Sequence, residues 1–131
     1  MRSKIFALSL CVISFSTFLF AQEYADITIE EMQICSSVED RKPIGISTIF
    51  SADVDRVYCF TKLSSNLDTT SVSHVWYYNE KEMANIELKI KAKTWRTWSS
   101  KRILNNWTGN WRVDVLSPSG EVLATKDFVV E

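Results

Sequence analysis

Glycine, proline, cysteine and histidine are scarce in this chain. Its 131 residues include three glycines, two prolines, three cysteines and one histidine. So few glycines and prolines exclude a collagen-like or low-complexity chain. A single histidine and no Cys-x-x-Cys pair give no zinc-binding pattern, so we expect no metal site and no cofactor.

An excess of positive charge is also lacking. The chain has 15 basic and 16 acidic residues, which gives a formal net charge of −1. A surface that binds nucleic acid is usually strongly basic, so we expect no nucleic acid partner. The rest of the composition, 46% hydrophobic, 12% aromatic and 24% charged, is that of one ordinary globular domain.

The first 21 residues have the three parts of a secretory signal peptide. Arg2 and Lys4 precede an uncharged, mostly apolar run over residues 5–20, and the small residue Ala21 follows. This order predicts cleavage after Ala21 and export to the periplasm or the extracellular space. A retained membrane anchor is the alternative, because the run is about as long as the shortest membrane-spanning helices. After cleavage we expect one domain over residues 22–131, without stable membrane insertion.

Cleavage would also remove Cys11 and leave Cys35 and Cys59 as the only cysteines. An even number of cysteines in an oxidising compartment is normally paired. The loop that they would close has about 25 residues, for which the chain-entropy estimate is roughly 3.5 kcal/mol of stabilisation. The sequence therefore predicts a disulfide between Cys35 and Cys59.

Alternating hydrophobicity and regularly spaced turn residues indicate an all-β domain. The clearest strand covers residues 84–93, where small or apolar side chains alternate with polar ones. Residues 39–51 are interpreted as a long connection that could hold one more strand at 45–50. The other expected strands cover residues 27–35, 56–63, 71–78, 96–103, 110–116 and 122–130. This number and spacing predict an immunoglobulin-like β-sandwich of about seven antiparallel strands.

Positive charge and tryptophan are concentrated in one segment, residues 88–113. It holds seven cations, no acid and four of the five tryptophans, whereas residues 22–87 hold twelve acids and five bases. A domain with two such different sides can orient an anionic partner. Tryptophan rings stack on sugars, and arginine or lysine pairs with carboxylates and phosphates. The residues proposed for this binding surface are Trp95, Arg96, Trp98, Lys101 and Arg112.

The alternative is that these tryptophans form the hydrophobic core, which is the more common fate of large aromatic side chains. Strand alternation places Trp111 on the inward face with its apolar neighbours, and it places Trp76 on the same face as Val72. Trp95 and Trp98 are three residues apart, so a regular strand directs them to opposite faces. At least one of the two is therefore a candidate for the surface.

The sequence contains no recognisable catalytic constellation. His74 shares a strand face with Val72 and Trp76, which favours a hydrogen-bonded, half-buried imidazole over a general base. We therefore expect a noncatalytic protein. The second hypothesis is a small envelope hydrolase or transferase that uses His74 with Glu82 or Asp114. The third is a structural subunit of an envelope assembly, joined through exposed sheet edges.

Five ordered motifs resemble a bacterial family known as domain of unknown function 2914. They are Asp40-Arg41-Lys42-Pro43, residues 57–61 (VYCFT), residues 74–76 (HVW), residues 95–101 (WRTWSSK) and residues 107–115 (WTGNWRVDV). The resemblance covers roughly residues 33–130. It implies a bacterial envelope protein and carries no settled activity. Together with the charge pattern, it leads us to expect an exported, noncatalytic binding or interaction module whose partner is an anionic glycan or an envelope protein.

Overall fold

The structure is a computed structural model that describes residues 26–131. The predicted signal peptide and Cys11 lie outside the described residues. The ten strands are β1 (Ile27–Cys35), β2 (Ser37–Glu39), β3 (Lys42–Ile44), β4 (Ile49–Phe50), β5 (Arg56–Ser65), β6 (Thr70–Tyr78), β7 (Lys81–Ile90), β8 (Thr94–Arg102), β9 (Gly109–Leu116) and β10 (Val122–Val130). Among the described residues no helix is long and apolar enough to cross a membrane.

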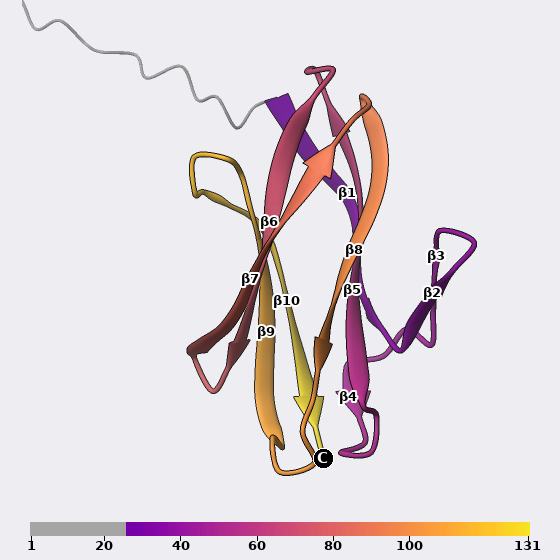
Figure 1. The fold of residues 1–131 in the computed structure, drawn as a ribbon, viewed down its shortest axis with the longest axis vertical. Coiled ribbons are helices and arrows are strands. Elements are labelled where there is room, and N and C mark those ends of the chain that lie inside the picture. Colours follow the sequence, from indigo (N-terminus) through magenta and orange to yellow (C-terminus); the bar gives the residue numbers. More distant parts are fainter. Residues whose placement is uncertain (1–25) are drawn as a thin grey trace, which may run out of the picture.

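The strands form two facing sheets and a small hairpin (Figure 1). One sheet has three strands in the order β1-β5-β8, and the other has five in the order β4-β10-β9-β6-β7. Every pairing is antiparallel except that of β4 with β10. The predicted all-β, sandwich-like architecture is confirmed. Seven strands of eight residues or more occupy the predicted positions within a few residues at each end.

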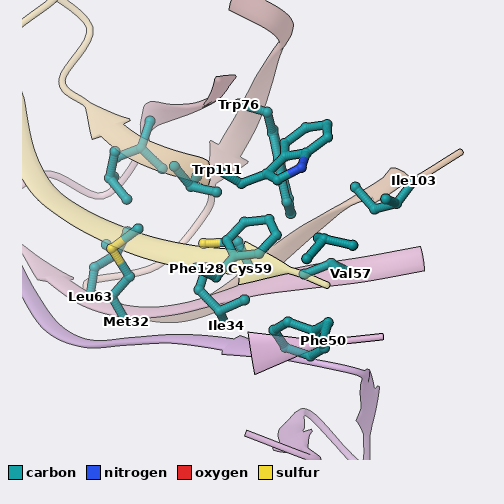
Figure 2. Close-up of a cluster of buried hydrophobic side chains, with 14 of the residues drawn as sticks. Met32, Ile34, Phe50, Val57, Cys59, Leu63, Trp76, Ile103, Trp111 and Phe128 are labelled. Atoms are coloured by element: carbon teal, nitrogen blue, oxygen red, sulfur yellow. The ribbon is translucent and has the colours of Figure 1, made fainter. Parts of the chain in front are cut away.

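The core fills the space between the two sheets, and strand alternation determines which side chains reach it. In β9, Trp111, Val113 and Val115 are buried, at 1%, 0% and 0% exposure, as the alternation predicts. Trp76 of β6 is fully buried as well. The rings of Trp111 and Phe128 stack with centroids 5.9 Å apart, and they face the apolar side chains of β1 and β5 (Figure 2). Both tryptophans therefore belong to the core.

Residues 36–55 differ from the expected long connection. Strands β2 and β3 form a hairpin on the side of the three-stranded sheet that faces away from the core, where β2 contacts β5 and β3 contacts β1 (Figure 1). The two-residue turn of this hairpin, Asp40 and Arg41, has positive φ angles of 51° and 60°. The single strand expected at 45–50 is reduced to the two residues of β4, which pair with the end of β10.

The predicted disulfide is wrong, because the structure holds Cys35 and Cys59 as free, buried thiols. In the β1–β5 ladder Cys59 lies opposite Ile34, and Cys35 lies opposite Tyr58. Adjacent positions along a strand direct their side chains to opposite faces of the sheet. Cys59 therefore points into the core and Cys35 points to the other side. A disulfide needs Cβ atoms about 4 Å apart on vectors that converge, and this register prevents it.

Candidate functional site

A group of cations surrounds an exposed tryptophan on the outer side of the three-stranded sheet. The β5–β8 ladder pairs Lys62 with Arg96, and it pairs Phe60 with Trp98. Trp98 is 37% exposed, whereas Phe60 is only 1% exposed although it faces away from the core. Phe60 is therefore covered on the outer side, where Trp98 and the β2–β3 hairpin lie. We call this surface the outer basic face; it comprises Arg41, Arg56, Lys62, Arg96, Trp98 and Arg102.

Hydrogen bonds and ion pairs fix several of these cations. Arg56 Nη1 donates to Ser100 Oγ at 2.9 Å, and Arg102 Nε lies 3.8 Å from a carboxylate oxygen of Asp55. Lys62 Nζ lies 3.7 Å from a carboxylate oxygen of Glu30. These contacts are near the surface, so each adds little stability. Two cations of this face, Lys62 and Arg102, thus each have an acidic neighbour.

Arg96 is placed by the tip of the β2–β3 hairpin. Its Nη1 donates to the backbone carbonyl of Arg41 at 3.3 Å, which brings the two arginines together. Arg41, Lys62, Thr94, Trp95 and Arg96 line a surface pocket of about 300 Å³. The predicted binding residues Arg96 and Trp98 therefore share the outer basic face, and the pocket lies beside them.

Two further predicted binding residues, Trp95 and Lys101, lie on the inward side of β8. Trp95 is opposite Leu63 in the ladder and packs partly buried against the core. Lys101 Nζ lies 5.1 Å from the centroid of the Trp107 ring, a cation–π contact. Burial, and secondarily the charge of Arg56, lower the pKa of Lys101. Lys101 is thus directed toward one end of the sandwich and not toward Trp98.

The fifth predicted binding residue, Arg112, belongs to the other sheet. Its guanidinium carbon lies 4.3 Å from the centroid of the Tyr77 ring, and its Nε donates to Asp114 at 3.1 Å. Its Nη1 forms an ion pair with Glu80 in the β6–β7 turn. Two carboxylates already neutralise Arg112, so it is a local structural contact, separated from Arg96 and Trp98 by the whole sandwich.

His74 connects the two sheets inside the core. It is 0% exposed. Its Nδ1 lies 2.6 Å from Ser99 Oγ on β8, and its Nε2 lies 2.9 Å from Thr61 Oγ1 on β5. Trp76 Nε1 also donates to Ser99 Oγ, at 3.1 Å. The neutral imidazole has one N–H group and one acceptor nitrogen, and Thr61 and Ser99 provide a hydroxyl partner for each.

This network keeps His74 neutral and inaccessible. Burial lowers the pKa of His74 to about 4 from its ordinary 6.5. Asp114 pairs with Val75 in the β6–β9 ladder and with Arg112 and Thr125 through its carboxylate, so it lies on the opposite face of the sheet. No carboxylate bonds to His74 among residues 26–131. Neither Glu82 nor Asp114 therefore assists it as a base.

In the part of the chain that the structure describes, no three His, Cys, Asp or Glu side chains gather where they could hold a metal ion.

Sequence reasoning missed four of the six members of the outer basic face. Arg41, Arg56 and Lys62 lie before the basic segment, and Arg102 was not selected within it. Only the strand register brings them next to Arg96 and Trp98. The sequence did contain a signal for Arg56 and Lys62. The two residues differ by an even number of positions in one strand, so they lie on the same face of the sheet.

Residues 69–130 match the family described as "Protein of unknown function (DUF2914)". The predicted resemblance is confirmed over these residues. The motifs at 40–43 and 57–61 lie before the matched region. A comparison with curated proteins finds no match.

Solved structures with a similar arrangement of strands include parts of large glycosidases. A GH3 β-glucosidase from Bifidobacterium adolescentis shares 8% identity with a TM-score of 0.46, over 79% of this chain and 17% of that one. A β-glucosidase from Listeria innocua in complex with laminaribiose shares 10% identity with a TM-score of 0.43, over 77% and 16%. A β-D-glucoside glucohydrolase from Trichoderma reesei shares 9% identity with a TM-score of 0.46, over 80% and 19%. This chain spans less than a fifth of each of these proteins.

Proposed function

We propose that this chain is an exported, noncatalytic binding module of the bacterial cell envelope that recognises an anionic glycan through its outer basic face. One observation carries the proposal: Trp98 is 37% exposed and lies between Arg96 and the strand end at Arg102 on the same side of β8. An aromatic ring offers a flat apolar surface for a sugar, and neighbouring arginines offer paired donors for carboxylates or phosphates.

The arrangement favours a glycan over an acidic protein segment. A large ring on an open sheet face suits a sugar ring, whose C–H groups form an apolar face. Phe60, which lies opposite Trp98 in the β5–β8 ladder, is already buried, so the aromatic surface that remains for a partner is small. An envelope protein that docks by hydrophobic burial would need a wider apolar patch.

Export is supported by the residues at the N-terminus. The basic start and the apolar run over 5–20 have the composition of a signal peptide. Cys35 and Cys59 are both 0% exposed, so free thiols at these positions are shielded from oxidants in the periplasm.

The finer fold assignment in this proposal is an immunoglobulin-like sandwich. Counting only the seven long strands, the first, second and fifth form one sheet, and the seventh, sixth, third and fourth form the other. The third long strand, β6, carries the fully buried Trp76. An immunoglobulin domain likewise buries a tryptophan on its third strand. The three short strands β2, β3 and β4 are additions to this plan.

The noncatalytic character of the proposal rests on His74. Both ring nitrogens are engaged with Thr61 and Ser99, and no solvent reaches the ring. A general base must reach a proton on its substrate, which this position does not permit.

Binding to polysaccharides tests the proposal directly. In calorimetric titrations we expect the purified protein to bind polygalacturonate and to show no binding of neutral dextran. Arg96→Ala and Trp98→Ala should each weaken binding about tenfold, the loss of one good contact. Lys126→Ala is the matched control, because Lys126 is an exposed cation on the other sheet and should leave the affinity unchanged.

Circular dichroism and thermal melting establish that each variant keeps its fold. The proposal is overturned when the wild-type protein binds neither polygalacturonate nor another anionic polysaccharide. It is also overturned when folded Arg96→Ala and Trp98→Ala variants bind as tightly as the Lys126→Ala control.

A further inference from the structure

We propose that Arg41 and Arg96 form a two-arginine clamp that binds one carboxylate or phosphate group of the glycan in the pocket beside Trp95. The inference rests on the proposed function, because it assigns a chemical group and a position to the partner of the outer basic face. It also adds Arg41, in the turn between β2 and β3, as a residue that determines specificity.

The pocket has the size and the lining for such a group. Its volume is about 300 Å³, and Arg41, Lys62, Thr94, Trp95 and Arg96 line it. The hairpin turn supplies one arginine and β8 supplies the other. Arg96 Nη1 donates to the backbone carbonyl of Arg41 at 3.3 Å, so the two residues are in contact at this pocket.

The charges in this pocket are not balanced within the described chain. Lys62 is paired with Glu30 at 3.7 Å, but no ion pair involves Arg41 or Arg96 within residues 26–131. Arg112 shows the contrast, since two carboxylates neutralise it on the other sheet. Two neighbouring arginines without a counter-ion repel one another, and an anion that bridges them removes this repulsion.

The backbone of Arg41 has a conformation that a variant can use to test the clamp. Its φ angle of 60° lies in the left-handed region, which a side chain larger than that of glycine adopts at a cost. The second position of a two-residue hairpin turn with positive φ is normally glycine. Glu80, at the same position of the β6–β7 turn, has a φ angle of 67°, so this conformation belongs to the turn type and does not by itself mark a binding site. Arg41 is also one of the residues that line the pocket.

Carboxylates and phosphates share the chemistry that this clamp recognises, since each offers two oxygens to a guanidinium fork. The two sources are a uronic acid residue and a phosphate ester on the glycan. Titration of the purified protein with galacturonate and, separately, with inorganic phosphate distinguishes them. We expect chemical shift changes at Arg41, Trp95 and Arg96 with the preferred probe, and none with galactose.

Three variants test the clamp. Arg96→Lys keeps the positive charge but removes the paired N–H donors of the guanidinium group, and it should reduce the affinity for the preferred probe several-fold. Arg41→Gly should reduce this affinity about tenfold and at the same time raise the melting temperature, because it removes the strain. A residue with a purely structural role would not show this opposite pair of effects. Lys126→Ala should change neither quantity.

Failure of the clamp and failure of the proposed function give different results. If Arg41→Gly binds galacturonate, phosphate and polygalacturonate as the wild type does, while Trp98→Ala has lost the polymer, the clamp is overturned and the glycan-binding face stands. If neither polygalacturonate nor another anionic polysaccharide binds but one small anion does, and Arg41→Gly abolishes that binding, the clamp stands and the glycan function is overturned. If neither small anion perturbs the pocket, the clamp is overturned.

Discussion

His74 shows how one buried residue can link stability to pH. The folded protein lowers the pKa of His74 to about 4, whereas the unfolded chain has the ordinary value of 6.5. Protonation would put a charge on a side chain that is fully buried in the core. Between these two pH values the unfolded chain binds the proton more tightly than the folded chain. The contribution of His74 to the free energy of unfolding is therefore fully present above pH 6.5, and it is lost as the pH falls toward 4.

The shift predicts the size of this effect and a way to isolate it. The difference between the folded and unfolded pKa of His74 corresponds to a loss of about 3 kcal/mol in the free energy of unfolding by pH 4. Urea unfolding at pH 7.5 and pH 4.5 should show the loss in the wild type. In His74→Gln this contribution should be absent, although the variant is less stable at both pH values. Acidic residues contribute equally to both proteins and cancel in the comparison. A wild-type pH dependence identical to that of His74→Gln would contradict the assignment.

The two thiols give the second prediction at this scale. Burial raises the pKa of Cys59 to about 12 and also raises that of Cys35, so neither forms the reactive thiolate at neutral pH. Ellman's reagent should find no reactive thiol among residues 22–131 of the folded protein and two after unfolding in urea. Dithiothreitol should leave the melting temperature unchanged. A mass lower by two hydrogens, together with a melting temperature that dithiothreitol lowers, would show that Cys35 and Cys59 form a disulfide.

Strand prediction from the sequence succeeded where a strand is long and has one solvent-exposed face. In β7 the partly buried Ala84, Ile86 and Leu88 alternate with the exposed Asn85 and Glu87, and the sequence shows this period directly. The strands β2, β3 and β4 have only two or three residues, too few to show a period. The disulfide prediction failed for a related reason. Sequence spacing does not reveal that Cys59 faces Ile34 across the ladder while Cys35 lies one position away.

The β2–β3 turn gives a prediction for an element. Arg41→Gly should raise the free energy of unfolding by up to about 1 kcal/mol, because relief of the left-handed strain exceeds the extra entropy of glycine in the unfolded chain. The melting temperature should rise by up to about 4 °C for a domain of this size. Lys42→Gly, one residue later in β3, has no such strain to relieve and should destabilise. A lower melting temperature for Arg41→Gly would show that the arginine stabilises the turn.

The β6–β7 turn and β9 form a second element-scale unit around Arg112. Arg112→Ala should destabilise the protein by about 1–2 kcal/mol, because the buried Asp114 loses its guanidinium partner and keeps only Thr125. The affinity for polygalacturonate should not change, since Arg112 lies on the other sheet. Chemical denaturation and calorimetric titration measure the two effects. Loss of binding in a folded Arg112→Ala protein would move the binding surface to the five-stranded sheet.

At the scale of the whole molecule, the basic segment of the sequence does not become one basic surface. Residues 88–113 belong to both sheets: Arg96 is on β8 of the three-stranded sheet, and Arg112 is on β9 of the five-stranded sheet. Both side chains point away from the core, so they lie on opposite sides of the sandwich. Cations from earlier in the chain, Arg41 and Lys62, take places beside Arg96 instead. The sequence could thus predict that the charges are unevenly distributed. It could not predict the surface, because that depends on the register between distant strands.

The net charge of −1 means that attraction to a polyanion must be local. The range of this attraction shrinks with salt, since the Debye length falls from about 30 Å at 0.01 M to about 8 Å at 0.15 M. We therefore expect the affinity for polygalacturonate to fall roughly tenfold over this range, because the arginines of the outer basic face act on several charges of the polymer at once. Arg96→Gln should make the slope of log affinity against log salt shallower. Trp98→Ala should lower the affinity at every salt concentration without changing the slope, since ring stacking carries no net charge. An affinity independent of salt, or a slope that Arg96→Gln leaves unchanged, would show that the outer basic face does not attract the polymer through its charge.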